Sequence, residues 1–306
     1  MNSRFCLIVN PMAGNGRGRT QLPSVAAVLT EAGAEHQVIE SQSLSHAREL
    51  AATAAGRGEI VVAVGGDGMA GALAGPVSAA GGSYGVIPAG RGNDLATVLG
   101  VPKDPAAAAR VLVGGTTRRI DLIGVSTAGQ PESIVAGSVY AGLPALAGQV
   151  ANDTKLIGGS LVYPLAALRV LAGWRPTVFG VRISGQQEPL EFSGYAVVVA
   201  NSAYFGAGMR VAPSAAIDDG ELDLVLMRHA PKLTFVRALL KISDGSHVTL
   251  RQITLHRGAE VTLTMDRDLP AAADGEALAC ASPLPAGTPL RIRVLPSALE
   301  VLIPAQ

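Results

Sequence analysis

The 306-residue sequence predicts an α/β domain with an open, mainly parallel sheet, followed by a β-rich, sandwich-like domain. Three observations support this fold class. Within residues 1–125, short apolar runs alternate with segments of helical spacing, the order typical of parallel sheets covered by helices on both faces. Beyond residue 125, β-branched runs separated by Gly, Pro and Asp turns take over. Two glycine-rich loops also follow consecutive apolar runs of the first part.

Each element of the first part is placed by its apolar spacing and by the residues that interrupt it. Ser45 is a candidate N-cap of the second helix, and Pro102 helps to end the fourth. The predicted strands span 5–9, 36–40, 59–64, 84–87 and 118–124, and the predicted helices span 22–32, 45–55, 71–79, 94–99 and 105–113.

The second part contains mostly strand patterns. We expect a domain boundary near residue 125, which gives domains 1–125 and 126–306, with the last strands able to return to the first domain. The predicted strands span 177–183, 195–200, 222–227, 259–265 and 290–295, and helical patterns interrupt them at 161–172 and 231–242.

Composition narrows the class of protein. Hydrophobic residues make up 48% of the chain, charged residues make up 16%, and the net charge is zero, so the sequence predicts a sizeable core and no nucleic-acid binding. Cys6 and Cys280 have neither metal-ligand nor disulfide spacing, which fits a reducing cytoplasm. The apolar stretch 161–174 is too short to span a bilayer, so at most we expect attachment to a membrane surface.

The two glycine-rich loops carry the strongest functional signal. One is GGDGM at 65–69, and the other is PAGRGND at 88–94. Glycines let a backbone approach a ligand closely, and backbone N–H groups can bind phosphate oxygens. An Asp in such a loop would repel phosphate unless a divalent cation lay between them. The loops therefore predict a Mg²⁺–nucleotide site at the carboxyl ends of the strands.

A third glycine-rich segment, 10–18, connects the first predicted strand to the first helix. Its spacing does not match a dinucleotide fingerprint. The residues alone leave two interpretations open, a tight turn and a contact with phosphate.

Five motifs in order, covering nearly the whole chain, resemble those of the diacylglycerol kinase catalytic family, which includes bacterial lipid kinases and sphingosine and ceramide kinases. They are NP at 10–11 with Gly14, GGDGM at 65–69, PAGRGND at 88–94, FGAGMRVAP at 205–213 with DDGELD at 218–223, and DGE at 274–276.

The resemblance implies an ATP-binding α/β domain and a β-rich lipid-substrate domain. It implies ATP and Mg²⁺ as cofactors, and transfer of the γ-phosphoryl group to a lipid hydroxyl, with diacylglycerol as the default acceptor. Because the lipid lies in a membrane, it also implies peripheral contact with the inner membrane face. The oligomeric state stays open.

The resemblance also implies roles for individual residues. Asp274 or Glu276 would act as the general base, and Asp67 would position the metal. Asp219, with Ala216 and Glu221, would bind a structural Mg²⁺. The residues that would hold the nucleotide are Asn10, Ser41, Gly65, Gly66, Asp67, Gly68, Gly90, Arg91, Asn93 and Asp94.

Simpler interpretations of the same residues stay open. The dipeptide 274–275 also suits a hairpin turn, and 218–221 also suits a solvated turn before a strand. The apolar segments 142–146 and 156–157 are candidate walls of the lipid site. The amphipathic segment 232–241 is compatible with packing on the sandwich and with contact to anionic lipid.

Several residues depart from the family's motifs. Met69 stands where the family has Thr, Ala70 and Gly71 stand where Asn and Glu usually follow, and Arg91 replaces the Thr of the second loop. Arg91 either pairs with phosphate or faces solvent. Two alternatives to a lipid kinase therefore remain, a soluble small-molecule kinase of the NAD kinase type and a catalytically degenerate lipid- or nucleotide-binding protein.

Overall fold

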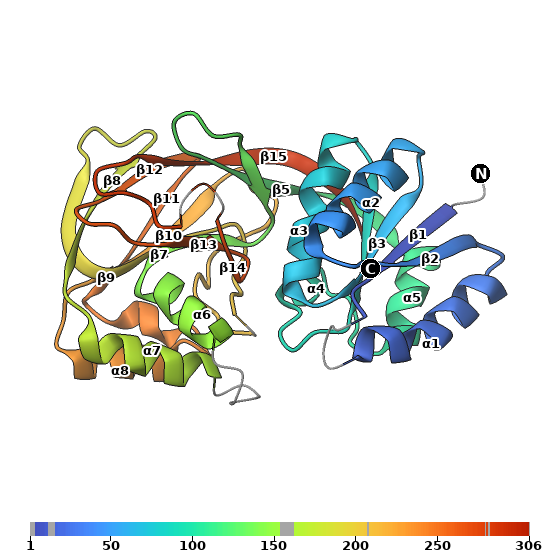
Figure 1. Cartoon of the computed structure of the whole chain (residues 1–306), viewed down its shortest axis with the longest axis horizontal. Helices are drawn as coiled ribbons and strands as arrows, with labels where there is room; N and C mark the ends of the chain where they lie inside the picture. The colour runs from blue at the N-terminus through green and yellow to red at the C-terminus, as the bar shows by residue number, and fades with distance from the viewer. Residues whose placement is uncertain are drawn as a thin grey trace. The chain divides into compact units, whose positions relative to one another are not determined.

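A computed structural model describes residues 4–11, 16–153, 162–206, 208–278, 280 and 282–305 (Figure 1). Its contacts divide the chain into two compact units. Unit 1 comprises Met1–Leu122 and Pro296–Gln306, and unit 2 comprises Ile123–Leu295. The predicted fold class is confirmed, because unit 1 is an α/β unit with a parallel sheet and unit 2 is rich in antiparallel strands.

Unit 1 alternates strands and helices along the chain. Its strands are β1 (Arg4–Val9), β2 (Glu35–Glu40), β3 (Ile60–Gly65) and β4 (Ser83–Pro88), and its helices are α1 (Arg17–Glu31), α2 (Leu44–Gly56), α3 (Asp67–Ala79), α4 (Asp94–Val98) and α5 (Pro105–Gly114). The end of β15 (Leu290–Ile303) joins this sheet, because Glu300 pairs in parallel with Ser83 of β4.

The strand order of this sheet is β2-β1-β3-β4-β15. Helix α2 packs beside α3, and α1 packs beside α5. Strands β1, β3 and β4 are buried along almost their whole length, as expected when helices cover both faces. All four strands β1 to β4 run in parallel, so their carboxyl ends meet at one edge. Ligands of open α/β sheets bind at this edge.

Predicted helix starts differ from the structure in several places. The first helix begins at Arg17, five residues earlier than the predicted 22–32. The second helix is capped by Ser43 and not by Ser45, because the extended backbone of Ser43 lets its hydroxyl accept the N–H of His46 at 3.1 Å. The third helix begins at Asp67, four residues earlier than the predicted 71–79, since Gly66 serves as its N-cap. The first turn of α3 therefore includes part of the first glycine loop.

Unit 2 is built mainly from strands. It contains β6 (Ser133–Val135), β7 (Ser138–Gly142), β8 (Thr177–Ile183), β9 (Leu190–Ala200), β10 (Leu222–Arg228), β11 (Ile253–Gly258), β12 (Glu260–Met265), β13 (Ala271–Ala273), β14 (Glu276–Ala277), the helices α6 (Leu143–Asp153), α7 (Val162–Gly173) and α8 (Lys232–Lys241), and the 3₁₀ helix η1 (Ser246–Thr249). Strand β5 (Thr116–Ser126) runs from unit 1 into unit 2.

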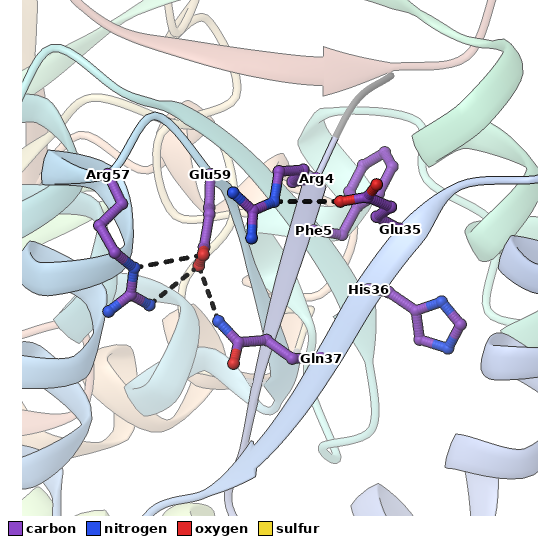
Figure 2. A pocket seen from close by; sticks show the side chains of 7 residues that line it. All are labelled: Arg4, Phe5, Glu35, His36, Gln37, Arg57 and Glu59. Carbon is purple, nitrogen blue, oxygen red and sulfur yellow. Dashed lines mark hydrogen bonds and ion pairs between the residues drawn. The ribbon is translucent and has the colours of Figure 1, made fainter.

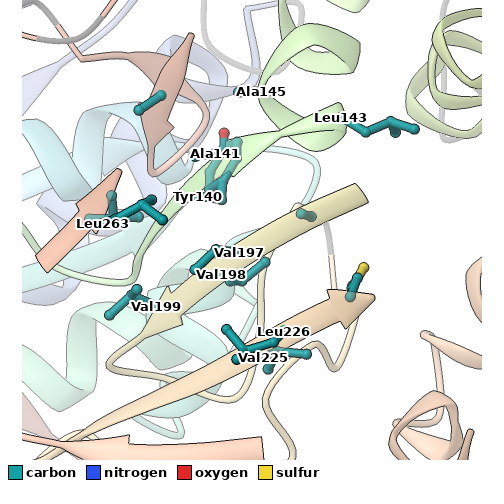
Figure 3. Close-up of a cluster of buried hydrophobic side chains, with 14 of the residues drawn as sticks. Tyr140, Ala141, Leu143, Ala145, Val197, Val198, Val199, Val225, Leu226 and Leu263 are labelled. Atoms are coloured by element: carbon teal, nitrogen blue, oxygen red, sulfur yellow. The ribbon is translucent and has the colours of Figure 1, made fainter. Parts of the chain in front are cut away.

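Strand β9 organises the sheet of unit 2. Its first half pairs with β8, and its second half pairs with β7 on one side and β10 on the other, all antiparallel. Figure 3 shows buried side chains of β7, β9 and β10, among them Tyr140, Val198 and Val225, which occupy paired positions and therefore lie on the same face of the sheet. Removing these apolar surfaces from water is the main stabilising contribution to the unit.

The helices of unit 2 include one that the sequence pattern did not predict. Helix α6 covers the predicted wall segment 142–146 except Gly142, which ends β7. The other wall segment, 156–157, and the first residue of the predicted helix 161–172 lie outside the described residues. In the part of the chain that the structure describes, no helix is both long and apolar enough to cross a bilayer.

Candidate active site

The two glycine loops lie side by side at the carboxyl edge of the unit 1 sheet. Strand β3 ends at Gly65 and α3 begins at Asp67, so Gly66 alone connects them. Gly65 pairs in register with Pro88, the last residue of β4. The N–H of Ala89 also donates to the Gly65 carbonyl at 2.8 Å, which continues the pairing into the loops.

Backbone contact between the loops explains two of the glycines. A Cβ atom added to Gly90 would lie 2.3 Å from the Cα of Gly66, and one added to Gly66 would lie 3.0 Å from the Cα of Gly90. At Gly90 no side chain fits against the facing backbone, and at Gly66 a Cβ would be in tight contact. Gly90 is therefore required for the packing of one loop on the other, whatever the loops bind.

Asn93 fixes the shape of the second loop. Its backbone has a φ of 60°, in the left-handed region that Asn adopts more readily than most residues. Its side-chain oxygen accepts the N–H of Gly90 at 2.8 Å, and its amide donates to the Gly90 carbonyl at 3.1 Å. Asn93 thus closes the loop onto Gly90, and the chain enters α4 directly afterwards.

Asp67 connects the loops through its side chain. Its two carboxylate oxygens accept the backbone N–H groups of Asn93 and Asp94, at 2.9 and 2.5 Å. The carboxylate therefore lies at the amino end of α4, where backbone N–H groups have no partner within the helix. A carboxylate has about four acceptor positions. Asp67 can therefore brace the loops and still offer an oxygen to a cation.

The other predicted nucleotide residues of unit 1 lie at the same edge. Asn10 follows β1, and its N–H donates to the carbonyl of Val64 on β3. Ser41 follows β2, is buried, and donates its hydroxyl to the Val9 carbonyl at 3.1 Å. The edge thus collects residues from the ends of four strands. Positions 12–15 of the first glycine-rich segment lie outside the described residues.

Two of the departures from the family motifs, Met69 and Arg91, have different surroundings. Met69 is 3% exposed and packs inside unit 1, so its side chain fills the core. Arg91 is exposed on the second loop. Of these two replacements, only the arginine is placed where it can meet a solute.

In unit 2, the carboxylate of Asp274 lies in a ring of backbone donors. It accepts N–H groups from three consecutive residues, Ala136, Gly137 and Ser138, at 2.9 to 3.2 Å. A Cβ on Gly137 would lie 2.7 Å from Asp274 Oδ1, so a side chain at this position would displace the carboxylate from these donors. The arrangement anchors the turn between β13 and β14 to the start of β7.

Asn201 supports this anchor, and the sequence pattern gave no sign of it. Its buried amide donates to the Ala136 carbonyl at 3.1 Å, and its N–H donates to the Gly137 carbonyl at 2.8 Å. The segment that receives Asp274 is therefore held from both sides. Gly137 and Asn201 are distant from Asp274 in the chain and belong to no motif that the sequence pattern singled out.

Glu276 differs from Asp274 in its surroundings. It begins β14 and is exposed, whereas Asp274 is half-buried and adopts a φ of 47°. A general base must reach the proton that it removes. Of the two candidate bases, Glu276 is the more accessible, and Asp274 holds the turn that presents it.

At the predicted structural metal site, the acidic side chains already pair with a positively charged side chain of the protein. The guanidinium of Arg257 pairs with Asp219, with Glu221 at 3.0 Å and with buried Asp223 at 3.4 Å. Ala216 is exposed nearby in the chain. Among the described residues, no group of three or more His, Cys, Asp or Glu side chains has a metal-holding arrangement. These contacts do not fit Mg²⁺ beside an unmoved Arg257.

A cavity of about 580 Å³ opens at the opposite edge of the unit 1 sheet (Figure 2). Figure 2 shows Arg57 and Gln37 reaching Glu59, and Arg4 reaching Glu35. The hydrogen bond from Arg57 lowers the pKa of Glu59. Burial, with the charge of Glu59, raises the pKa of neighbouring Cys6 to about 11, so its thiol is unreactive at neutral pH. The positively and negatively charged side chains that line this cavity thus pair with one another.

Comparisons with known proteins agree with the division into an α/β part and a β-rich part. The family model described as the diacylglycerol kinase catalytic domain matches residues 4–125. The model described as the YegS C-terminal NAD kinase beta sandwich-like domain matches residues 137–303. Among solved structures, one described as a diacylglycerol kinase from Bacillus anthracis has a TM-score of 0.73 at 18% identity, covering 99% of this chain and 97% of that one, and so supports the fold.

Similar curated proteins extend over most of the chain. One named diacylglycerol kinase from Mycobacterium tuberculosis is 30% identical over 302 residues, which is 97% of this chain and 94% of that protein. Another of the same name from Bacillus subtilis is 28% identical over 89% of each chain. The chain therefore belongs to the diacylglycerol kinase-like family of lipid kinases, phosphotransferases whose acceptor is an alcohol.

Proposed function

We propose that this chain transfers the γ-phosphoryl group of ATP to the hydroxyl of a membrane lipid, with diacylglycerol as the acceptor. The observation that carries the proposal is the pair of glycine loops, which Asp67 joins at the ligand-binding edge of a parallel sheet. Phosphoryl transfer depends mainly on positioning and on neutralisation of charge, which rigid loops can provide.

The residues present suit a nucleotide with its metal. The first turn of the 13-residue helix α3 follows Gly66 directly, and the amino end of a helix favours anions such as phosphate. Arg91 adds a cation on the facing loop. Asp67 keeps acceptor positions for Mg²⁺. The bound Mg²⁺ would supply charge neutralisation at the phosphate oxygens.

The acceptor hydroxyl must lose its proton during transfer. We assign this task to Glu276, because it is exposed, while the carboxylate of Asp274 is engaged by three backbone N–H groups. Asp274 is then a positioning residue.

ATP and a bilayer acceptor meet at the inner membrane face, so we also propose a cytoplasmic protein with peripheral membrane contact, serving phospholipid metabolism.

The test is transfer of labelled γ-phosphate from Mg²⁺–ATP to lipids in mixed micelles. The acceptors are diacylglycerol, ceramide, sphingosine and a polyprenol, with NAD as a soluble comparison. Asp67→Ala and Glu276→Gln are assayed beside the native chain. Glu188→Gln, which changes an exposed glutamate on a turn of unit 2, is the matched control.

We expect labelled diacylglycerol with the native chain and the control, and a loss of about 10²–10⁴-fold in rate with Glu276→Gln. Transfer of labelled phosphate to NAD, without transfer to any lipid, would mean that the chain is a soluble small-molecule kinase and not a lipid kinase. Nucleotide binding without transfer to any acceptor would replace it by a binding protein, for which the buried Met69 in place of a loop Thr is the supporting observation.

A further inference from the structure

Helix α8 exposes apolar side chains on a face that does not pack on unit 2. Leu240 is 76% exposed and Leu233 is 62% exposed, the two highest values for large apolar side chains in the part of the chain that the structure describes. Phe235 and Ala238 of the same helix are buried. The helix thus packs through one side, and Leu233, Arg237 and Leu240, spaced at i, i+4 and i+7, share the other.

Helix α7 repeats this pattern. Leu165 is 47% exposed, Leu168 is 40% exposed, and Arg169 is exposed beside them, while Ala166 and Ala167 are buried. Exposed apolar side chains at i and i+3 with a basic residue at i+4 lie on one face of a helix. This is the second helix of unit 2 that shows leucines and a basic residue to solvent.

The two helices are neighbours. Figure 1 shows α7 and α8 next to each other within unit 2, and they are in contact. The ammonium group of Lys232, at the start of α8, donates to the carbonyl of Ala172 near the end of α7 at 2.7 Å. We call the exposed sides of both helices the α7–α8 face. Its residues are Leu165, Leu168, Arg169, Leu233, Arg237, Leu240 and Lys241.

Charge indicates what covers this face. Helices α7 and α8 contain the basic residues Arg169, Lys232, Arg237 and Lys241 and no Asp or Glu. Lysine is depleted at the centre of protein–protein interfaces, whereas leucines beside Lys and Arg are typical of helices that lie on membranes. The leucines would enter the boundary between headgroups and acyl chains, and the basic residues would meet anionic headgroups.

We propose that the α7–α8 face is the surface by which this chain docks on anionic lipid bilayers. The inference rests on the proposed function for its purpose, since a lipid kinase must reach an acceptor that stays in the membrane. Binding itself requires neither ATP nor transfer, so it can be measured separately.

The test is flotation of the full chain with phosphatidylcholine vesicles and with vesicles that also contain phosphatidylglycerol, without nucleotide. We expect binding only to the anionic vesicles. Arg237→Gln with Lys241→Gln should weaken it roughly 25-fold, at about fivefold per charge. Leu233→Ser with Leu240→Ser should weaken it at least about tenfold, because two leucines no longer enter the bilayer.

Matched controls change the same residue types elsewhere in unit 2. Leu255→Ser removes an exposed leucine of β11, and Arg182→Gln removes an exposed arginine of β8. Both should float like the native chain, and thermal unfolding should be unchanged in all variants, since every altered side chain is exposed. Native chain that stays in solution, equal binding to neutral vesicles, or face variants that bind like the controls would each overturn the proposal.

A second assay separates this inference from the proposed function. A short-chain diacylglycerol dissolved as monomers requires no bilayer docking. The face variants should phosphorylate it at the native rate. If the native chain binds anionic vesicles but phosphorylates no acceptor, the kinase proposal fails and the docking surface stands.

Discussion

The carboxylate of Asp67 accepts the backbone N–H of Asn93 at 2.9 Å and thereby links the loop that follows β3 to the loop that follows β4. Its other oxygen accepts the N–H of Asp94, the first residue of α4. An aspartate that sequence motifs would assign to nucleotide chemistry alone therefore also has a structural role. This role can be measured without a nucleotide.

Replacing Asp67 by Ala should destabilise unit 1 in the absence of ligand. Two part-buried N–H groups lose their acceptor, which costs about 1–3 kcal/mol in unfolding free energy. Urea unfolding measures the change. Asp104→Ala is the comparison, because Asp104 caps α5 through a single bond to the Ala107 N–H and should cost about 1 kcal/mol. An Asp67→Ala variant as stable as the native chain would limit this residue to ligand binding.

Gly90→Ala should separate the two loops. The added Cβ would lie 2.3 Å from the Gly66 Cα, so backbone must move, at a cost of about 1–3 kcal/mol. Nucleotide affinity should fall with stability, and calorimetry with a non-hydrolysable ATP analogue measures it. Gly56→Ala is the matched control, because a Cβ at this position in α2 meets nothing within 4 Å. Equal behaviour of the two variants would contradict the proposed loop contact.

Variants of the two acidic residues of the DGE motif should have different effects, one on the stability of the chain and the other on the rate of phosphoryl transfer. Asp274→Ala leaves three N–H groups without an acceptor and should lower the melting temperature of the chain. Glu276→Gln changes an exposed side chain, so it should leave the melting temperature unchanged while transfer falls about 10²–10⁴-fold. Stability is read by circular dichroism and transfer by labelled phosphate. The reverse pattern would make Asp274 the base.

Part of this structure follows from local sequence. Strands β1, β3 and β4 are buried on both faces, so they are continuous apolar runs that the sequence shows directly. The glycine loops at their ends are equally visible. Helix α6 was not predicted, although Leu143, Leu146 and Val150 recur at helical spacing, because Pro144 and Gly148 favour a turn in the segment LPALAGQVAND.

The contacts that give the site its form were not predictable, because they join residues far apart in the chain. Asn201 reaches the carbonyl of a residue 65 positions earlier, and Gly137 donates to a carboxylate 137 positions later. Arg257 meets Asp219 only because β10 and β11 pair, which sets Asp223 opposite Arg257. Such partners depend on strand register and not on local spacing.

Arg257→Gln should make the acidic turn of unit 2 respond to Mg²⁺. In the native chain the guanidinium pairs with Asp219, Glu221 and Asp223, so Mg²⁺ should leave the melting temperature unchanged. Without it, the carboxylates repel one another, the melting temperature should fall, and Mg²⁺ should restore it. Arg182→Gln, on β8, should show neither effect. A native chain that Mg²⁺ stabilises, with the effect lost in Asp219→Asn, would support the structural metal site instead.

His247 should make the chain less stable in mild acid. Burial lowers its pKa below the ordinary value of 6.5, although the Val211 carbonyl, 3.0 Å from Nε2, and Asp244 act in the opposite direction. The folded chain thus keeps His247 neutral at a pH where the unfolded chain binds a proton. Its contribution to the unfolding free energy is complete above about pH 6.5, the ordinary pKa that applies in the unfolded chain. It is lost as the pH falls through the lower pKa of the folded chain.

Urea unfolding at a series of pH values from neutral to mildly acidic tests this. His247→Gln should flatten the dependence of unfolding free energy on pH, because a titrating group is removed. Burial and the charge of Arg228 also lower the pKa of His256, so the double variant should be flatter still. An unchanged slope in His247→Gln would mean that its burial does not govern acid stability, and that carboxylates such as Glu59, whose pKa Arg57 lowers, do so instead.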